Sequence, residues 1–352
     1  MVDDGGRPAQ GTGRGTGRPT LTTVARIAGL SRGTASRALR GDPNVSAAAL
    51  AAVRRAAEMV GYRPDLNARS LALGRSGSIG LLVSESNDRV FHDPFFAEAA
   101  RGAHRELSRH GTQLVLMLSQ TPQERARALD FAAGRHLDGV LLISVRGDDP
   151  VHETLLAQRI PVVFCGRVSA ARTESGLWWV DADNRGGARA AVRHLVQAGR
   201  RRIAILGGPS DLSVGRERVA GWRDELRASG LDPAPALLER GKFSYDFGRE
   251  GARRLLEREP AVDAIFATSD QIAFGALRTL REAGRRVPDD VALVGFDDSP
   301  AAAEADPPLT TVRQPVEEMG CRMAAMLLGK LAGTPGEASV VLPTELVVRR
   351  ST

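Results

Sequence analysis

The sequence predicts a small all-α domain followed by an α/β region built as two lobes with parallel sheets. Two observations support this fold class. The first part of the chain shows helical spacing and no strand pattern, and from residue 78 onward short apolar runs alternate with amphipathic helical segments. Continuous apolar runs separated by helices are typical of parallel strands covered on both faces. A chain of 352 residues is long enough for two or three domains.

Three short helices are expected in the all-α domain. Thr22 or Thr23 can cap the first helix, and Gly29 can end it. Ser31 can cap the second helix, and a third begins at Ser46 with apolar residues at helical spacing. The segment "GYRP" ends the third helix, because a proline disfavours helical backbone at the residue before it.

The α/β pattern occurs twice, which indicates two lobes. In such sheets ligands bind at the carboxyl ends of the strands, so two lobes that face each other form a ligand cleft. The predicted strands span 78–83, 112–118, 138–144 and 161–165 in the first lobe, and 202–208, 263–268 and 291–298 in the second. The predicted helices span 95–110, 122–135, 215–229, 245–257 and 270–284.

Composition excludes several classes of protein. With 42% apolar and 26% charged residues the chain resembles an ordinary soluble protein, and no apolar run approaches the roughly 18 residues of a membrane span. Residues 1–19 are Gly-rich, which predicts a disordered tail and no signal peptide, so we expect a cytoplasmic protein without a membrane partner. Cys165 and Cys321 are expected as buried free thiols, and the histidines show no metal-ligand spacing, so no metal or cofactor is predicted.

The positive charge is concentrated at the start of the chain. Residues 1–74 hold eleven arginines and five acids, which accounts for the whole formal excess of +6. A basic head on a neutral body is typical of a nucleic-acid-binding module attached to another domain. The alternative is a solvated, arginine-rich end without a partner.

The segment "LSRGTASRALRG" (30–41) fits the second helix of a helix-turn-helix, which enters the DNA major groove by its N-terminal residues. Arginine can bind guanine O6 and N7 together, whereas short hydroxyl side chains suit phosphate oxygens. A glycine on this helix lets the backbone approach the DNA closely. The candidate DNA contacts are Ser31, Arg32, Gly33, Thr34, Ser36, Arg37 and Asn44.

Beyond this motif, the chain resembles the LacI/GalR family of bacterial regulators from residue 20 to about 349. The resemblance rests on "TLTTVARIAGLSRGTASRALRG" and on "VDADNRGGARAAVRHL", "RERVAGW", "ATSDQIAFGALRTL", "DVALVGFDD" and "PPLTTVRQP", which occur in the family's order. It implies a helix-turn-helix DNA-binding domain over 20–63, a hinge helix and linker over 64–77, and an effector-binding and dimerisation domain over 78–352. The last would have the two-lobed fold of type I periplasmic binding proteins.

The resemblance also implies that the hinge contacts DNA. Leu71 matches the leucine that wedges into the minor groove, with Ala68 one turn earlier on the same face. Without the resemblance, Leu71 would be interpreted as a linker leucine packed on the core.

In the cleft, Arg218 and Asp297 match the arginine and the acid that hydrogen-bond the effector. Asp270 is either a ligand contact or the N-cap of its helix, and the phenylalanines either stack on a ring or belong to the core. Arg167 beside Gly166 would pair with Arg218 to suit an anionic or highly oxygenated ligand. The full set of expected effector contacts is Phe95, Phe96, Arg167, Arg218, Phe243, Ser269, Asp270, Gln271 and Asp297.

The expected function is therefore sequence-specific DNA binding under the control of a small molecule, a sugar or sugar derivative. We expect a homodimer on a near-palindromic operator. Repression is expected because it is the family's commoner mode; activation and a non-sugar effector are the alternatives. The chain lacks G-x-S-x-G, G-x-x-x-x-G-K-[ST] and H-E-x-x-H, so no catalytic residue is predicted. A solute-binding protein without a regulatory role is a further alternative, which the basic head disfavours.

Overall fold

The computed structural model describes residues 19–63, 75–144, 146, 149, 151–167, 177–334 and 336–352. The chain divides into two units, Met1–Ser76 and Gly77–Thr352. Ala68, Leu71 and nearly all of the expected tail and hinge lie outside the described residues, so the predictions for them stay predictions.

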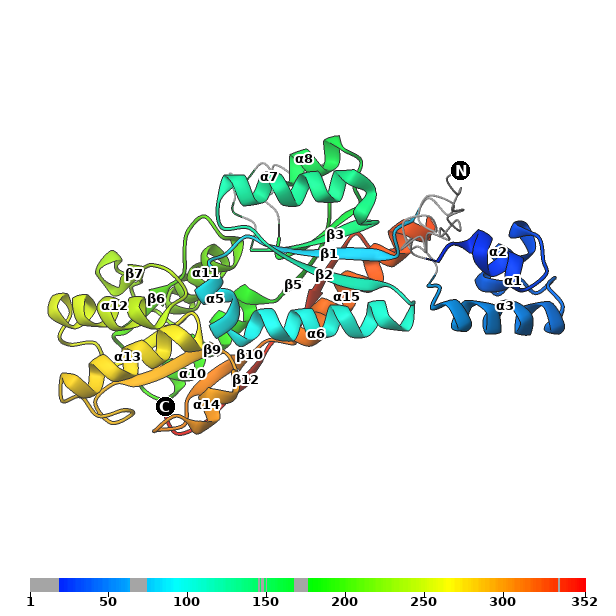
Figure 1. The fold of residues 1–352 in the computed structure, drawn as a ribbon. Helices are drawn as coiled ribbons and strands as arrows, with labels where there is room; N and C mark the ends of the chain where they lie inside the picture. Colours follow the sequence, from blue (N-terminus) through cyan, green and yellow to red (C-terminus); the bar gives the residue numbers. More distant parts are fainter. Residues whose placement is uncertain are drawn as a thin grey trace, which may run out of the picture. The chain divides into compact units, whose positions relative to one another are not determined.

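The first unit is a three-helix bundle. Alanines fill much of its core, with Ala25, Ala35, Ala38 and Ala56 buried around Val24 and Val53. The α2 helix contributes only Ala35 and Ala38 as fully buried residues, and its polar residues lie on the outward face. The helices are α1 (Leu21–Ile27), α2 (Arg32–Arg40) and α3 (Ala47–Val60) (Figure 1).

Side-chain caps fix where these helices begin. Ser31 and Ser46 cap α2 and α3, as predicted. The predicted cap of α1 is wrong: the side chain of Thr20 accepts the hydrogen bond, and Thr23 donates it through its backbone N–H. Thr20 has the extended backbone that an N-cap requires, whereas the next residue is already helical.

The end of α3 also has a different cause from the predicted one. Gly61 takes the left-handed conformation directly after Val60, and its N–H bonds back to the last turn. This is the common glycine C-cap, so the helix has already ended three residues before Pro64.

In the second unit, the first lobe is a parallel sheet between two layers of helices. One face packs on α6 (Pro94–Arg109) and α15 (Val316–Ala332), and the other on α7 (Pro122–Phe131) and α8 (Val151–Ala157) (Figure 1). Alternate residues of the central strand serve the two faces: Ile79 and Leu81 belong to one core cluster and Leu82 to the other. The strand order is β11 (Ser339–Leu342), β5 (Trp178–Ala182), β4 (Val162–Cys165), β3 (Gly139–Ile143), β1 (Ser78–Val83) and β2 (Gln113–Leu118).

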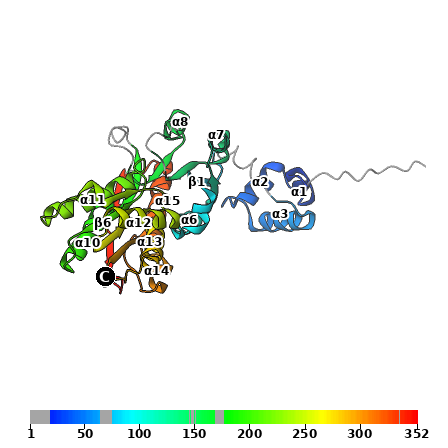
Figure 2. The same cartoon turned by 90° about the vertical axis from the view of Figure 1, so that its left-hand side faces the viewer.

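The second lobe repeats this layering around its own core. Helices α10 (Asn184–Gln197) and α11 (Ser213–Ala228) pack together, as do α12 (Tyr245–Arg258) and α13 (Asp270–Glu282), and Figure 2 shows the two pairs on opposite sides of β6. The strand order is β12 (Glu345–Val347), β10 (Thr310–Arg313), β9 (Ala292–Asp297), β8 (Ala264–Ala267), β6 (Ile203–Gly207) and β7 (Leu238–Arg240), and only β12 runs antiparallel. Short helices α5 (Asn87–His92) and α14 (Pro300–Glu304) complete the unit.

The chain passes between the lobes three times. It leaves the first lobe after β5, returns to it as α15, and passes from β11 back to β12. The sequence pattern, interpreted as one lobe after the other, did not predict these returns. They matter because Asn184 and Gln314, at the first two passages, lie in the cleft.

Every predicted strand and helix of the two lobes is present, with boundaries shifted by a few residues at most. Within the described ranges, no helix is long and apolar enough to cross a membrane. The same residues hold no group of three His, Cys, Asp or Glu side chains suited to a metal ion.

Candidate DNA-binding face and effector cleft

The outward face of α2 carries the predicted DNA contacts. Ala35 and Ala38 point into the bundle, whereas Arg32, Gly33 and Arg37 are exposed. The side chains of Arg32 and Arg37 make no hydrogen bond or ion pair with any residue that the structure describes, so their guanidinium groups are available to a partner.

The shorter polar side chains of this face are held locally. The Ser31 hydroxyl caps α2 and lies 2.9 Å from the Thr34 hydroxyl. The amide of exposed Asn44 donates to Asp42 at 3.0 Å. Ser36 is half-buried, and its carbonyl accepts from Arg40. The bonds of Ser31, Thr34 and Asn44 fix those side chains before any DNA is present, which favours binding because less rotamer freedom is lost.

The fold does not require the glycine at position 33. An added Cβ there would meet only Ser31 Oγ, at 3.8 Å, and Gly33 has ordinary helical backbone. An absent side chain on an exposed helical face is therefore consistent with close approach to a partner.

The second unit contains a cleft between its lobes, with a small deep compartment of about 70 Å³. Arg218, on α11, is its central cation and is only 3% exposed. Its Nε donates to Asn184 Oδ1 at 2.9 Å and its Nη1 to the Thr268 carbonyl at 2.6 Å, and the guanidinium stacks on Phe296 at 3.6 Å. Its Nη2 makes no hydrogen bond with the described residues, which leaves a donor for a ligand oxygen.

Three carboxyl groups surround this arginine. Asp297 ends β9 with a strained positive φ of 119°, and it accepts from Gln314 at 2.6 Å and from Arg218 at 3.5 Å. Asp181 and Asp93 come from the first lobe. Burial raises the pKa of all three carboxyls, to about 6 for Asp181, and Arg218 opposes the rise. Such carboxyls are well suited to accept hydrogen bonds from hydroxyl groups.

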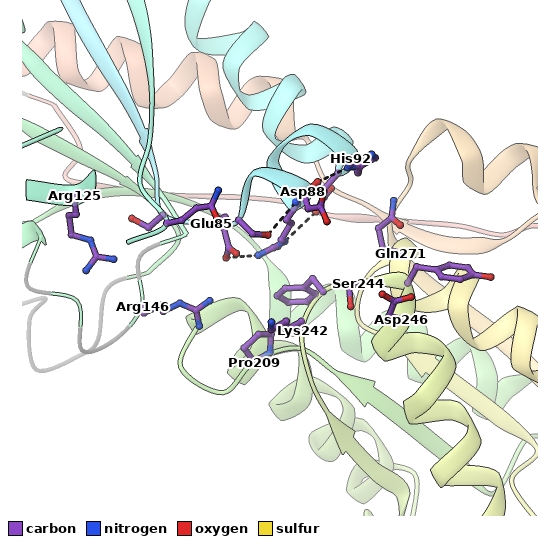
Figure 3. Close-up of a pocket in the computed structure, with 17 residues that line it drawn as sticks. Glu85, Asp88, His92, Arg125, Arg146, Pro209, Lys242, Ser244, Asp246 and Gln271 are labelled. Carbon is purple, nitrogen blue, oxygen red and sulfur yellow. Dashed lines mark hydrogen bonds and ion pairs between the residues drawn. The ribbon is translucent and has the colours of Figure 1, made fainter. Parts of the chain in front are cut away.

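A larger outer compartment of about 650 Å³ adjoins the deep one. Its first-lobe wall includes Glu85, Asp88, His92 and Arg125, and its second-lobe wall includes Lys242, Ser244, Asp246 and Gln271 (Figure 3). The two compartments share Arg89, Asp93 and Phe243.

Arg89 lies at the junction of the two compartments, and no sequence motif marked it. Its Nη1 bonds to Glu85 at 2.5 Å, and its guanidinium lies 4.8 Å from the Phe243 ring centroid, across the cleft. Its buried Nε lies 3.7 Å from Asp93 but makes no hydrogen bond. A buried donor without an acceptor is costly unless a ligand supplies one.

Most predicted effector residues line the cleft. The deep compartment contains Phe95, Arg218, Phe243, Ser269 and Asp297, and the outer compartment contains Gln271 as well as Phe243. Arg167 lies just beyond the deep compartment: it is exposed, and its backbone N–H donates to Asp181.

Two predicted contacts lie behind the cleft surface. Phe96 is 3% exposed and packs in the core of the first lobe, so the core interpretation is correct for this ring. Asp270 is 1% exposed, and its carboxylate accepts from Ser299 and Thr311. It thus holds the loop after β9. The N-cap of α13 is Ser269, not Asp270, because Ser269 accepts from the Ile272 N–H.

The charges of the deep compartment do not favour an anion. Arg218 already lies against Asp297, and the carboxylate of Asp181 lies 3.7 Å from the Arg167 Nε. Of the two ligand types that the arginine pair was expected to suit, these ion pairs favour the highly oxygenated one over the anionic one in this compartment.

Comparisons with known proteins agree with this picture. Residues 20–65 match the family model described as bacterial regulatory proteins, lacI family, and residues 192–352 match a periplasmic binding protein-like domain. The HTH-type transcriptional regulator CelR of Thermobifida fusca is 44% identical over 335 residues, which cover 95% of this chain and 98% of CelR. The ribose operon repressor of Escherichia coli (strain K12) is 32% identical, over 86% of this chain and 89% of that protein.

Solved structures show the same likeness. A transcriptional regulator CelR–cellobiose complex matches with a TM-score of 0.77 and 43% identity, over 95% of this chain and all of that chain. The lac repressor dimer bound to operator and the anti-inducer ONPF matches with a TM-score of 0.84 and 27% identity, over 95% of this chain and 99% of that chain.

A helix-turn-helix unit and a two-lobed unit with a polar cleft define a DNA-binding regulator that responds to a small molecule. The chain belongs to the lacI family of bacterial regulatory proteins. The relatives named above are transcriptional regulators.

Proposed function

We propose that the protein is a transcriptional repressor whose operator affinity is controlled by a neutral disaccharide of the cellobiose type. It would bind a near-palindromic operator as a homodimer. The proposal includes a cytoplasmic location, where a bacterial regulator meets its DNA, and no catalytic activity.

The observation that carries the effector proposal is the division of the cleft into two joined compartments. The deep one supplies Arg218, Asp181 and Asp297 to hydroxyls at the inner end of the first sugar unit, and Phe243 offers an aromatic face at the junction. The outer one has room for a second unit. The 43% identical CelR was solved with cellobiose, which supports the same class of ligand here.

Ligand contacts at both lobes and at the passages between them suggest how binding could act on the DNA-binding unit. Asp93 and Asp181 belong to the first lobe, and Arg218 and Asp297 to the second. A ligand that bonds to both sets favours the arrangement in which the lobes are closest, and operator affinity changes by the difference in ligand affinity between the two arrangements.

The DNA contacts proposed for α2 are Ser31, Arg32, Gly33, Thr34, Ser36 and Arg37, with Asn44 after the helix, and Ala68 and Leu71 are proposed for the hinge. Truncation of Leu71 to alanine should weaken binding to the operator more than binding to random DNA. Equal losses on the two DNAs would contradict the wedge proposed for this residue.

Isothermal titration calorimetry of the full-length protein tests the effector class. We expect cellobiose to bind with a dissociation constant at least about tenfold lower than that of glucose or ribose, because only the disaccharide fills both compartments. Tighter binding of a monosaccharide, or no binding of cellobiose, would contradict the proposal.

A further inference from the structure

The chain contains only two lysines, Lys242 and Lys330, among many arginines. Lys330, on α15, lies over the Trp178 ring, with its Nζ 5.1 Å from the ring centroid. Lys242 lies in the wall of the outer compartment, directly before Phe243. One of the two ammonium groups of the chain is therefore placed at the effector cleft.

Lys242 is exposed, and its ammonium makes no ion pair or hydrogen bond with the described residues. Two other cations of the outer compartment, Arg125 and Arg146, are already engaged. Arg125 lies 3.1 Å from Asp149, and Arg146 pairs with Asp211. Asp246 is a carboxylate of the same wall, but no ion pair joins it to Lys242 among the described residues, so the Lys242 charge is available to a ligand.

The outer compartment is electrically uneven. Figure 3 shows Arg125, Arg146 and Lys242 on one side together with Glu85, which already bonds to Arg89, and Asp88 and Asp246 on the other. The Arg125 Nε is buried and has no hydrogen-bond acceptor. An acceptor on a ligand would remove the cost of this unpaired donor.

The deep compartment has the opposite character. Asp93, Asp181 and Asp297 surround Arg218, so a further anion there would be buried against three carboxyl groups. A ligand with one anionic end would place its neutral unit in the deep compartment and its anionic end in the outer one.

We propose that the outer compartment accepts a carboxylate on the second unit of the effector, so that the protein also binds an aldobionic acid, a glycosyl-aldonate. This inference rests on the proposed function, because it assumes a two-unit sugar in the cleft. The Lys242 ammonium pairs with the carboxylate, and the Arg125 Nε is placed to donate to an oxygen of the same unit.

The experiment compares cellobiose with cellobionate, its aldonic acid, by titration calorimetry on the full-length protein. Cellobionate binds the wild-type protein within about threefold of cellobiose or more tightly, and its affinity falls with added salt. Lys242→Gln weakens cellobionate at least about tenfold more than it weakens cellobiose. Lys330→Gln, the matched control, changes neither affinity, and retained operator binding shows that both variants fold.

The outcomes separate this inference from the function on which it rests. If cellobiose binds and cellobionate is more than tenfold weaker, or if Lys242→Gln weakens both sugars equally, the carboxylate site is wrong and the disaccharide effector stands. If neither sugar binds, both proposals are wrong.

Discussion

Gly33 occupies the second position of α2, where an added methyl group would meet only Ser31 Oγ at 3.8 Å. Alanine is a better helix former than glycine, so Gly33→Ala should raise the free energy of unfolding of the DNA-binding unit by about 0.5–1 kcal/mol. The same methyl group lies on the face proposed to contact DNA, so operator affinity should fall. Denaturation with urea and fluorescence anisotropy on operator DNA measure the two effects.

For Gly33→Ala we expect the free energy of unfolding to rise while the operator affinity falls. Gly41→Ala, at a left-handed position with φ of 75°, serves as a control and should lower stability. If Gly33→Ala leaves operator affinity unchanged, the helix does not approach the DNA as closely as proposed.

Asp181 should make stability depend on pH. Burial raises the pKa of its carboxyl from 3.8 to about 6. Between about pH 4 and 6 the native protein holds a proton that the unfolded chain has released, so the free energy of unfolding falls as pH rises through this window, by about 3 kcal/mol. Asp181→Asn removes the titrating group, and urea denaturation across the window should show a flatter profile.

Asp270 titrates in the same pH range, since burial also raises its pKa to about 6. Asp181→Asn should therefore reduce the pH dependence and not abolish it. The exposed Asp130→Asn serves as a control with an unchanged profile. A slope for Asp181→Asn equal to that of the wild-type protein would show that the buried carboxyl does not gain its proton on folding.

Many residues of the cleft could be predicted from local sequence patterns, whereas others lie in the cleft only because of tertiary packing. Arg218 and Asp297 belong to segments with a recognisable pattern, and the structure brings their side chains to one cavity. Arg89 and Asn184 acquire their roles from tertiary packing. Arg89 lies against Phe243 of the second lobe, and Asn184 lies where the chain passes from the first lobe to the second. No local pattern reports such contacts.

At the level of elements, α6 and α15 approach so closely that glycine is required. A Cβ on Gly102 would lie 1.9 Å from the Glu317 carbonyl oxygen, and one on Gly320 would lie 2.1 Å from that of Ala99. Gly102→Ala should push the helices apart and lower the free energy of unfolding by roughly 1–3 kcal/mol. Thermal and urea denaturation of the full-length protein measure the loss.

Gly329, further along α15, provides the matched control. An added Cβ there meets nothing within 4 Å, so Gly329→Ala should leave stability unchanged or raise it by up to about 1 kcal/mol. Similar effects of the two substitutions would contradict the role assigned to the close approach of α6 and α15.

The elements predicted best from sequence are buried strands with continuous apolar runs, such as β1 and β3. Among the missed strands, β7 has three residues, β11 and β12 lie at sheet edges with exposed side chains, and β5 and β10 are buried strands of only five and four residues. These segments become strands because they pair with a neighbouring strand. Such pairing depends on the tertiary fold, so the local sequence does not predict it. The long helix α15 follows the last strand predicted for the second lobe and was not predicted.

At the scale of the whole molecule, the three passages of the chain between the lobes could not be predicted from the order of the elements in the sequence. Each lobe is built from separated stretches of chain, and the passages at Asn184 and Gln314 contribute polar groups to the cleft. Asn184 bonds Arg218, and Gln314 bonds Asp297. A ligand that binds these groups would therefore act on the segments that join the two lobes.

The central claim is that a disaccharide in the cleft controls DNA binding by the first unit. The most direct test is fluorescence anisotropy of the full-length protein on an operator selected in vitro, with and without saturating cellobiose. We expect cellobiose to change the operator dissociation constant by about tenfold or more, which corresponds to a coupling free energy of about 1.4 kcal/mol. An operator affinity that is the same with bound cellobiose as without it would contradict the account.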